Sequence, residues 1–183
     1  MNRMSGTIFF AALCILGLPP AVHSEDLSQC LHGWDATEAR DYAHAIELYE
    51  VCIRDGGLGM ATLARTYRNI GITYRRAGQP GKAIAAFDKA IALRPGDMAD
   101  DYINRGNAHD EAGDFEQALA DYAKALDIQP GHGEAYYNRG IAYERHHQFD
   151  AARTDFIAAY NEGLRTDLLY DRLVAYGLVK DAP

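Results

Sequence analysis

Apolar, aromatic and small residues return along this chain at helical spacing, in paired stretches. Within residues 64–98, each stretch places such residues three or four positions apart, which is the period of one helical face. The residues concerned are Tyr67, Gly71, Tyr74, Ala83, Phe87 and Ala90. A turn with Gly78 and Pro80 separates the stretches, and proline suits a first helical position. The pattern predicts a helix–turn–helix hairpin, in which small residues let two helices approach and aromatic residues fill the space between them.

The same pattern occurs three times at a nearly constant period. Three segments carry Tyr, Asn and Gly at identical offsets: Tyr67–Thr73, Tyr102–Ala108 and Tyr136–Ala142. The glycines in these segments lie 35 and 34 residues apart. Self-similarity at a period of about 20–50 residues indicates stacked units rather than a single closed core. Such stacks present an extended surface, which favours a binding function.

With the glycine taken as position 8 of each unit, the chain resembles the tetratricopeptide repeat (TPR) family, whose unit of about 34 residues carries aromatic residues, Gly, Ala and Pro at fixed offsets. The unit that begins at Ala64 fits eight family positions, with Tyr67, Ile70, Gly71, Tyr74, Ala83, Phe87, Ala90 and Pro95. The unit that begins at residue 99 departs from the pattern at Arg105 and His109. The unit from residue 133 departs at Arg139 and Leu164. The resemblance implies an all-α fold, a right-handed α-solenoid of helix–turn–helix TPR hairpins with a C-terminal capping helix.

A weaker copy precedes these units, and a different pattern follows them. Upstream, Gly33 falls at position 8, and Ala45, Tyr49 and Cys52 fall at the second-helix positions. Downstream, Thr166 or Asp167 is expected to cap a last helix that stops at Gly177. Asp114 and Gln117 predict a capping box at the second helix of the middle unit. The expected organisation is a signal peptide at 1–24, a degenerate TPR-like hairpin at 25–63, TPR units at 64–98, 99–132 and 133–165, and a capping helix with a tail at 166–183.

The N-terminal residues indicate a secretory signal peptide. Arg3 precedes an apolar stretch at residues 8–18, Pro19 and Pro20 end it, and cleavage is expected after Ser24. The stretch is shorter than the roughly 20 residues that span a bilayer. We therefore expect an exported protein, periplasmic or secreted, without stable membrane insertion after cleavage. An uncleaved N-terminal anchor is the alternative.

Net charge limits the class of partner that is expected, and the two cysteines bear on the cellular compartment. The formal net charge is −8 at pH 7, and an acidic chain repels phosphate backbones, so no nucleic acid partner is expected. In an antiparallel hairpin where position 8 faces position 24, position 5 faces position 27, which brings Cys30 opposite Cys52. An oxidising compartment then predicts a Cys30–Cys52 disulfide. Two buried free thiols are the alternative.

The resemblance also implies a concave groove lined by the first helices of the units. Carried over residue by residue, the candidate peptide-binding residues are Arg65, Arg68, Asn69, Arg75, Arg76, Ile103, Asn104, Asn107, Tyr137, Asn138 and Ile141. Trp34 joins them if the first unit keeps the register. The side-chain amides of Asn69, Asn104 and Asn138 can hold a peptide backbone. The alternative is that a neighbouring carbonyl satisfies them.

Four arginines of one unit, Arg65, Arg68, Arg75 and Arg76, point to an acidic group on the ligand, because guanidinium forks suit carboxylates and phosphates. The alternative is that Arg75 and Arg76 pair with Asp110 and Glu111 of the next unit.

The chain carries no motif of a nucleophile elbow, a phosphate loop or a zinc protease, so it is expected not to be an enzyme and to need no cofactor. His146 and His147 are adjacent and point about 100° apart on a helix, which argues against a shared metal. His109 replaces a family Tyr and is expected to serve the core. We expect an adaptor or scaffold that binds a protein or peptide segment in the groove within the cell envelope. The alternatives are an assembly subunit that packs through its convex face or C-terminal helix, and a module for a metal or small molecule. The sequence leaves the oligomeric state open.

Overall fold

The computed structural model describes residues 24–55, 58–94 and 98–179. Within these ranges the chain forms nine α-helices and no strand. Their bounds are α1 Ser24–Glu38, α2 Tyr42–Arg54, α3 Met60–Arg76, α4 Pro80–Leu93, α5 Ala99–Ala112, α6 Phe115–Ile128, α7 Gly133–Arg145, α8 Phe149–Asn161 and α9 Asp167–Ala175. The predicted signal peptide falls almost wholly on residues 1–23, which lie outside the described residues.

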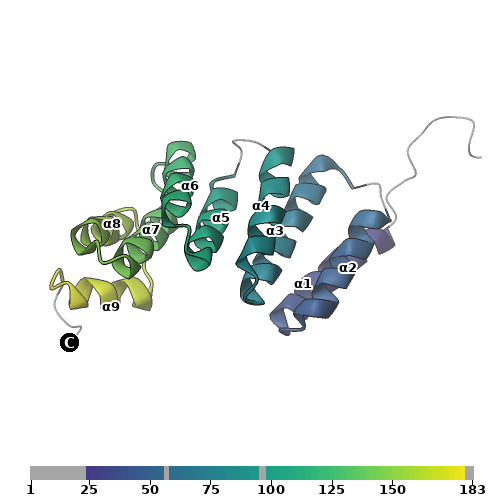
Figure 1. The fold of residues 1–183 in the computed structure, drawn as a ribbon, viewed down its shortest axis with the longest axis horizontal. Coiled ribbons are helices and arrows are strands. Elements are labelled where there is room, and N and C mark those ends of the chain that lie inside the picture. The colour runs from purple at the N-terminus through teal and green to yellow at the C-terminus, as the bar shows by residue number, and fades with distance from the viewer. Residues whose placement is uncertain (1–23, 56–57, 95–97, 180–183) are drawn as a thin grey trace, which may run out of the picture.

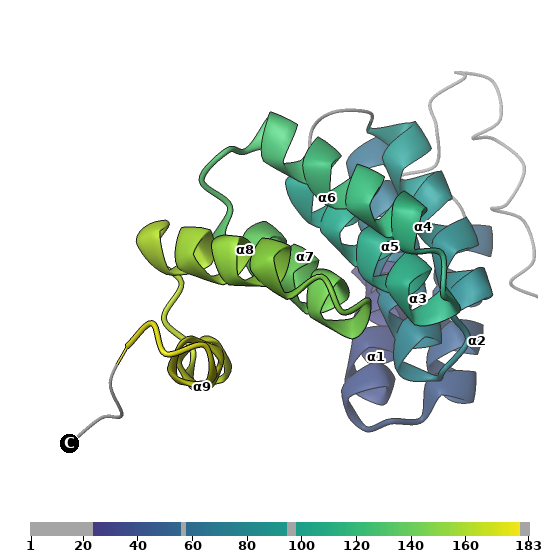
Figure 2. The same ribbon diagram turned by 60° about the vertical axis from the view of Figure 1, so that its left-hand side comes forward.

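The helices pair in chain order and the pairs stack side by side. Figure 1 shows α1–α2, α3–α4, α5–α6 and α7–α8 as successive hairpins along one elongated array, with α9 after the last pair. In Figure 2, α9 is seen almost along its own axis beside α7 and α8. Leu169 and Leu173 of α9 are buried in one cluster with Phe156 of α8, so α9 covers the open end of the stack. The predicted all-α solenoid with a C-terminal capping helix is confirmed.

One contact recurs in all four described hairpins and fixes how their helices face each other. The glycine at position 8 lies against the aromatic ring at position 24. A Cβ atom added to the glycine would lie within 3 Å of that ring in each pair: Gly33 and Tyr49 at 2.8 Å, Gly71 and Phe87 at 2.5 Å, Gly106 and Tyr122 at 2.9 Å, and Gly140 and Phe156 at 2.7 Å. Only a residue without a side chain allows this approach. The first hairpin therefore keeps the register of the others, although its first helix lacks the aromatic positions.

Each hairpin turn uses the left-handed backbone conformation at one equivalent position. The φ angles are 63° at Arg40, 69° at Gly78, 88° at Gly113 and 59° at His147. Glycine adopts this conformation without cost, whereas other residues pay about 1–2 kcal/mol. The predicted turn at Gly78 is confirmed, and the turns at Arg40 and His147 are strained by a non-glycine residue.

The capping box predicted for the middle unit is wrong. Asp114 is the N-cap residue of α6, but its side chain accepts no capping hydrogen bond. Its carboxylate lies 3.6 Å from Nδ1 of His109 instead. The expected cap of the last helix does form, because Thr166 accepts a hydrogen bond from the backbone N–H of Leu169 at 3.2 Å.

Candidate functional site

The first helices of the hairpins lie on the inside of the curve. Among the described residues, α1 contacts α3, α3 contacts α5, and α5 contacts α7, whereas successive second helices stay further apart. A stack whose first helices are closer together than its second helices bends toward the first helices. The inner face is therefore made by α1, α3, α5 and α7, as the resemblance implied.

Two of the predicted groove arginines are engaged with the next hairpin. Arg68 makes a bidentate ion pair with the buried carboxylate of Asp101, with one N···O distance of 3.0 Å. This hydrogen bonding raises the pKa of the Arg68 guanidinium above its ordinary value. Arg75 donates to Glu111 at 2.9 Å, as the alternative interpretation predicted. These arginines hold adjacent hairpins together, which leaves less of their hydrogen-bonding capacity for a ligand.

The other two arginines of the unit are more exposed. Arg76 pairs backward with Glu38 of α1 at 2.6 Å rather than with the next unit, and its guanidinium lies 5.8 Å from the centre of the Trp34 ring. Arg65 is exposed, and no described residue pairs with it. Arg65 is thus the arginine of this unit that remains open to an acidic ligand.

Ile103 does not belong to the groove, which corrects the prediction. Its side chain is 4% exposed and packs in the core with Ala125. The reason is geometric, because position 5 faces position 27 of the same hairpin and therefore points inward. Tyr137 occupies position 5 of its own unit and is half-buried, with its ring centre 5.9 Å from that of Phe156.

The groove asparagines differ in how they are satisfied. Asn104 donates to the backbone carbonyl of Asp100 at 2.9 Å, which is the alternative that the sequence left open. Asn107 accepts a hydrogen bond from the Tyr122 hydroxyl at 2.7 Å. Burial raises the pKa of Tyr122, so this hydroxyl stays a neutral donor. Asn69 is half-buried on α3, and its side chain lies near the hydroxyl of Tyr49.

A small polar pocket of about 110 Å³ lies where α3, α5 and α7 meet on the inner face. Its lining residues are Arg75, Asn107, Asp110, Glu111, Tyr122, Asn138, Ile141 and Arg145. Asp110 is the most buried charge in it, since its side chain is 4% exposed. One of its oxygens, Oδ2, pairs with Arg145, whereas Oδ1 is buried and accepts no hydrogen bond from any described residue. His146 Nε2 lies 3.9 Å from Oδ1, which is too far for a hydrogen bond.

The pocket also contains an unused donor. Nε of Arg75 is buried and has no acceptor among the residues that the structure describes. A buried polar group without a partner costs about 1–3 kcal/mol, so such groups normally take a partner, which is ordered water or a ligand. The pocket thus lies beside a buried acceptor and a buried donor that have no partner, with the side chains of Asn107 and Asn138 next to them.

An apolar stripe on α1 extends the inner face at its N-terminal end. Leu27, Leu31 and Trp34 are 37%, 67% and 36% exposed and lie three or four residues apart on one face. They occupy unit positions 2, 6 and 9, as the register from Gly33 shows. Trp34 was predicted conditionally from the sequence, whereas Leu27 and Leu31 were not predicted. The position of Gly33 was the signal that could have identified them.

The structure brings Cys30 of α1 and Cys52 of α2 together, with Cα atoms 5.5 Å apart and the two sulfurs bonded. This is the spacing that disulfides have. Cys52 is fully buried, and Cys30 Sγ lies 3.3 Å from the Thr66 hydroxyl of α3. Whether the bond persists in the cell depends on the compartment, which stays a prediction.

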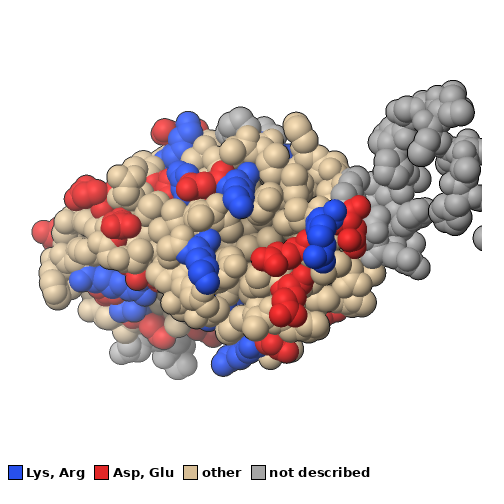
Figure 3. Space-filling view, turned by 45° about the vertical axis from the view of Figure 1, so that its right-hand side comes forward, with Lys and Arg blue, Asp and Glu red and all other residues tan. Residues whose placement is uncertain are grey.

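Charges of both signs are mixed on the surface. Figure 3 shows Lys and Arg interspersed with Asp and Glu over one face of the molecule, without a broad area of one sign. Some charged side chains form ion pairs between successive hairpins, such as Arg145 with Asp110 and Arg75 with Glu111. The surface in this view does not favour a ligand of one charge.

The histidines take structural positions. His109 is largely buried, between the carboxylates of Asp114 and Asp121, and His146 stacks on Phe115 with ring centres 3.9 Å apart. No group of three or more His, Cys, Asp or Glu side chains in the described part of the chain has the arrangement of a metal site. Over the same residues, no helix combines the length and the apolar character needed to cross a membrane.

Two family models match the sequence, and both describe the tetratricopeptide repeat. One matches residues 64–97 and again residues 99–132, and the other matches residues 122–154. Among curated proteins, no sequence matches this chain.

Solved structures show the same fold. YrrB, described as a TPR protein with an unusual peptide-binding site, is 20% identical, with a TM-score of 0.66 over 80% of this chain and 73% of its own. MamA is 27% identical, with a TM-score of 0.64 over 75% of this chain and 77% of its own. The first TPR of Spaghetti (RPAP3), bound to the HSP90 peptide SRMEEVD, is 20% identical, with a TM-score of 0.58 over 64% of this chain and 92% of its own.

Proposed function

Because the chain belongs to the tetratricopeptide repeat family, we propose that it is a non-enzymatic protein–protein interaction module that binds an extended polypeptide segment along its inner face. Two proteins of the same fold are described as peptide binders, YrrB and the RPAP3 domain. The signal-peptide pattern at residues 1–24 adds the cell envelope as the place of action.

The polar pocket on the inner face carries this proposal. A peptide group has one N–H donor and one carbonyl acceptor. Asp110 and Arg75 both line the pocket, where Asp110 Oδ1 is a buried acceptor and Arg75 Nε a buried donor without a partner. A volume of about 110 Å³ holds only a few water-sized groups, since one water takes about 30 Å³. The pocket therefore suits one peptide group of a bound segment better than a large side chain.

The apolar stripe gives the segment a second contact. Leu27, Leu31 and Trp34 offer apolar surface at the N-terminal end of the same face, and Arg65 offers a free cation on the next inner helix. A segment along the inner face would place main chain in the pocket, an apolar side chain on α1, and an acidic group near Arg65. Burial of one large apolar side chain contributes about 1.5–3 kcal/mol, so the stripe adds substantially to affinity.

The test is an affinity capture from the envelope fraction with four forms of the natively processed chain. Asp110→Ala removes the unused acceptor, and Leu31→Asp breaks the apolar stripe. Asp127→Ala is the matched control, because it removes the same charge from an exposed site on α6. Thermal unfolding of each form shows whether it is folded.

We expect partners that are captured by the unchanged chain and by Asp127→Ala but lost with Asp110→Ala and Leu31→Asp. Peptides tiled across a captured partner then locate the bound segment by calorimetry, with at least a tenfold loss of affinity for Asp110→Ala. Equal capture by all four forms contradicts an inner-face site.

A further inference from the structure

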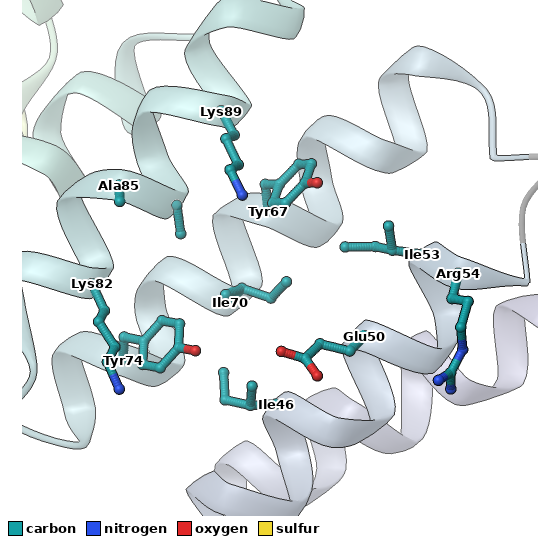
Figure 4. Close-up of a pocket in the computed structure, with 11 residues that line it drawn as sticks. Ile46, Glu50, Ile53, Arg54, Tyr67, Ile70, Tyr74, Lys82, Ala85 and Lys89 are labelled. Atoms are coloured by element: carbon teal, nitrogen blue, oxygen red, sulfur yellow. The ribbon is translucent and has the colours of Figure 1, made fainter.

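An apolar groove opens on the outer side of the stack, away from the pocket described above. It lies between α2 and α4 with α3 as its floor, and its volume is about 380 Å³. Figure 4 shows Ile46 and Ile53 of α2 on one side, Ile70 of α3 at the base, and the carboxylate of Glu50 pointing into the groove. A volume of this size is within the range of binding sites, about 300–1,000 Å³.

The groove lies where the α3–α4 hairpin lacks an ion pair that the two hairpins after it have. At the positions equivalent to Ile70 and Ala86, the next hairpin carries Arg105 and Asp121, joined by bonds of 2.9 and 2.6 Å. In the hairpin after it, the equivalent pair is Arg139 with Asp155, at 2.7 and 2.8 Å. There, the long arginine side chain fills the space between the helices.

In the α3–α4 hairpin, the same two positions are apolar and shorter. Ile70 and Ala86 are 7% and 6% exposed, and they pack with Ile46 and Ile53 of α2. The rings of Tyr67 and Tyr74 line the groove on either side of this floor. The α3–α4 hairpin therefore exposes an apolar concavity at a place where α5–α6 and α7–α8 are closed.

The charges around the groove define what it can accept. Lys82 Nζ lies 5.4 Å from the Tyr74 ring and Lys89 Nζ 5.1 Å from the Tyr67 ring, so cation–π contacts occupy both lysines. Arg54 lies at the edge of the groove and points away from it in Figure 4. Glu50 makes no ion pair or hydrogen bond with any residue that the structure describes. The wall formed by α2 thus presents an apolar, an acidic and an apolar residue over two helical turns, in the order Ile46, Glu50 and Ile53.

The opposite pattern is exposed on α8 of the same chain. Phe149 is 51% exposed and Ile157 is 36% exposed, and both lie on the solvent side of the helix. Arg153 lies between them on that side, is exposed, and has no described ion-pair partner. Phe149 and Ile157 are about 12 Å apart along the helix, compared with about 10.5 Å for Ile46 and Ile53. This helix face therefore has the apolar, basic, apolar order and nearly the length that the groove requires.

From this match we propose that the outer groove binds α8 of a second copy of the chain. Arg153 of the second copy would face Glu50, with its Phe149 and Ile157 against Ile46, Ile53 and Ile70. The groove and α8 lie toward opposite ends of the array in Figure 1. The contact is therefore head-to-tail, and contacts of this kind lead to rings or open filaments rather than closed two-fold dimers. The inner face takes no part in it.

The experiment is sedimentation of the natively processed chain from about 1 µM to about 1 mM, the range in which weak associations dissociate. The groove variant combines Ile70→Arg with Ala86→Asp, which installs the ion pair of the neighbouring hairpins and fills the groove. The helix variant combines Phe149→Ser with Arg153→Glu. We expect the unchanged chain to form oligomers that grow with concentration, and each variant alone to remain monomeric.

Mixing the two variants is the decisive step. The intact groove of the helix variant meets the intact α8 of the groove variant, so the mixture forms dimers that grow no further. Three results would overturn the proposal: an unchanged chain that stays monomeric throughout, variants that still form oligomers alone, or a mixture that stays monomeric.

A charge reversal tests the same contact without altering the floor of the groove. Glu50→Lys replaces an exposed residue and carries little risk for folding, and it should weaken association at least tenfold. Arg153→Glu in the partner copy should restore it. Glu47→Lys is the matched control, since Glu47 is exposed on the same helix and does not line the groove. Equal weakening by both lysine variants would overturn the proposed Glu50–Arg153 pairing.

Discussion

The α3–α4 and α5–α6 hairpins have the same backbone plan and differ in what joins their two helices. Both place a glycine against an aromatic ring, Gly71 on Phe87 and Gly106 on Tyr122, and both turn through a glycine with positive φ. In α5–α6, a bidentate ion pair adds to the junction, whereas α3–α4 has Ile70 against Ala86. The pattern of small and aromatic residues is therefore sufficient for the hairpin. The other junction between its two helices, an ion pair or an apolar contact, varies from hairpin to hairpin.

The two junctions have similar expected energies and different consequences for the surface. A buried ion pair loses most of its Coulomb energy to desolvation, so an apolar replacement of similar volume is often neutral or stabilising. Exchange of one junction for the other can then change a closed surface into an apolar groove at little cost in stability. Function can differ between repeats while the fold stays constant.

The largest predicted effect comes from breaking one ion pair on one side only. Asp121→Ala leaves Arg105 with Asp88 as its remaining carboxylate partner, at 2.6 Å. We expect the free energy of unfolding to fall by about 3 kcal/mol, at the lower end for a broken buried pair because Arg105 keeps Asp88. Chemical denaturation measures the change, with Asp127→Ala as the exposed control. A loss equal to that of the control would show that the pair does not stabilise the α5–α6 junction.

Substitution of the contact glycine is predicted to have the second-largest effect on stability, and to have it in both hairpins. A Cβ at Gly71 would lie 2.5 Å from the Phe87 ring, and one at Gly106 would lie 2.9 Å from the Tyr122 ring. Overpacking of this kind costs about 1–3 kcal/mol, so Gly71→Ala should destabilise the chain by about 2 kcal/mol and Gly106→Ala by less. Gly81→Ala, where a Cβ meets nothing within 4 Å, controls for helix propensity. The opposite order for Gly71 and Gly106 would contradict the contact distances.

Complete exchange of the junctions is predicted to change stability only slightly. Arg105→Ile with Asp121→Ala converts the α5–α6 junction to the α3–α4 type, and Ile70→Arg with Ala86→Asp does the reverse. We expect each pair of changes to shift the unfolding free energy by no more than about 1 kcal/mol, because paired and apolar junctions nearly balance. The single changes should each cost more than the pair, and a double-mutant cycle measures that coupling. Additive single effects would mean that the two positions act independently.

The smallest predicted effect concerns the turns, where α7–α8 differs from the other two TPR hairpins. His147 adopts a φ of 59° where they have glycine. His147→Gly should stabilise the chain by about 1 kcal/mol, since the left-handed conformation costs a non-glycine residue about that amount. Gly113→Ala should destabilise it by a similar amount, and thermal unfolding measures both. A loss of stability in His147→Gly would show that the ring contact with Phe149, at 5.8 Å, outweighs the backbone strain.

The groove residues show which contacts could not be predicted from the sequence. Asn104 and Arg75 were each given two interpretations, and the structure shows the intramolecular one for both, with Asp100 and Glu111 as partners. Ile103 was assigned to the groove by its unit position and is instead buried. The polar pocket was not predicted, because its residues come from three hairpins and their convergence depends on how those hairpins are offset.

The sequence by itself determined the helices, the turns and the facing of each hairpin. Apolar residues at helical spacing specify the helices, and one glycine opposite one aromatic ring sets how they meet, so the information lies within a single unit. Only the tertiary structure decided which charges pair between units, that Asp110 Oδ1 and Arg75 Nε remain unused on the inner face, and that the outer groove is open beside α3. These features depend on the rotation and shift between successive hairpins. Rotation and shift result from packing over the whole contact between two hairpins and cannot be deduced from the repeat period.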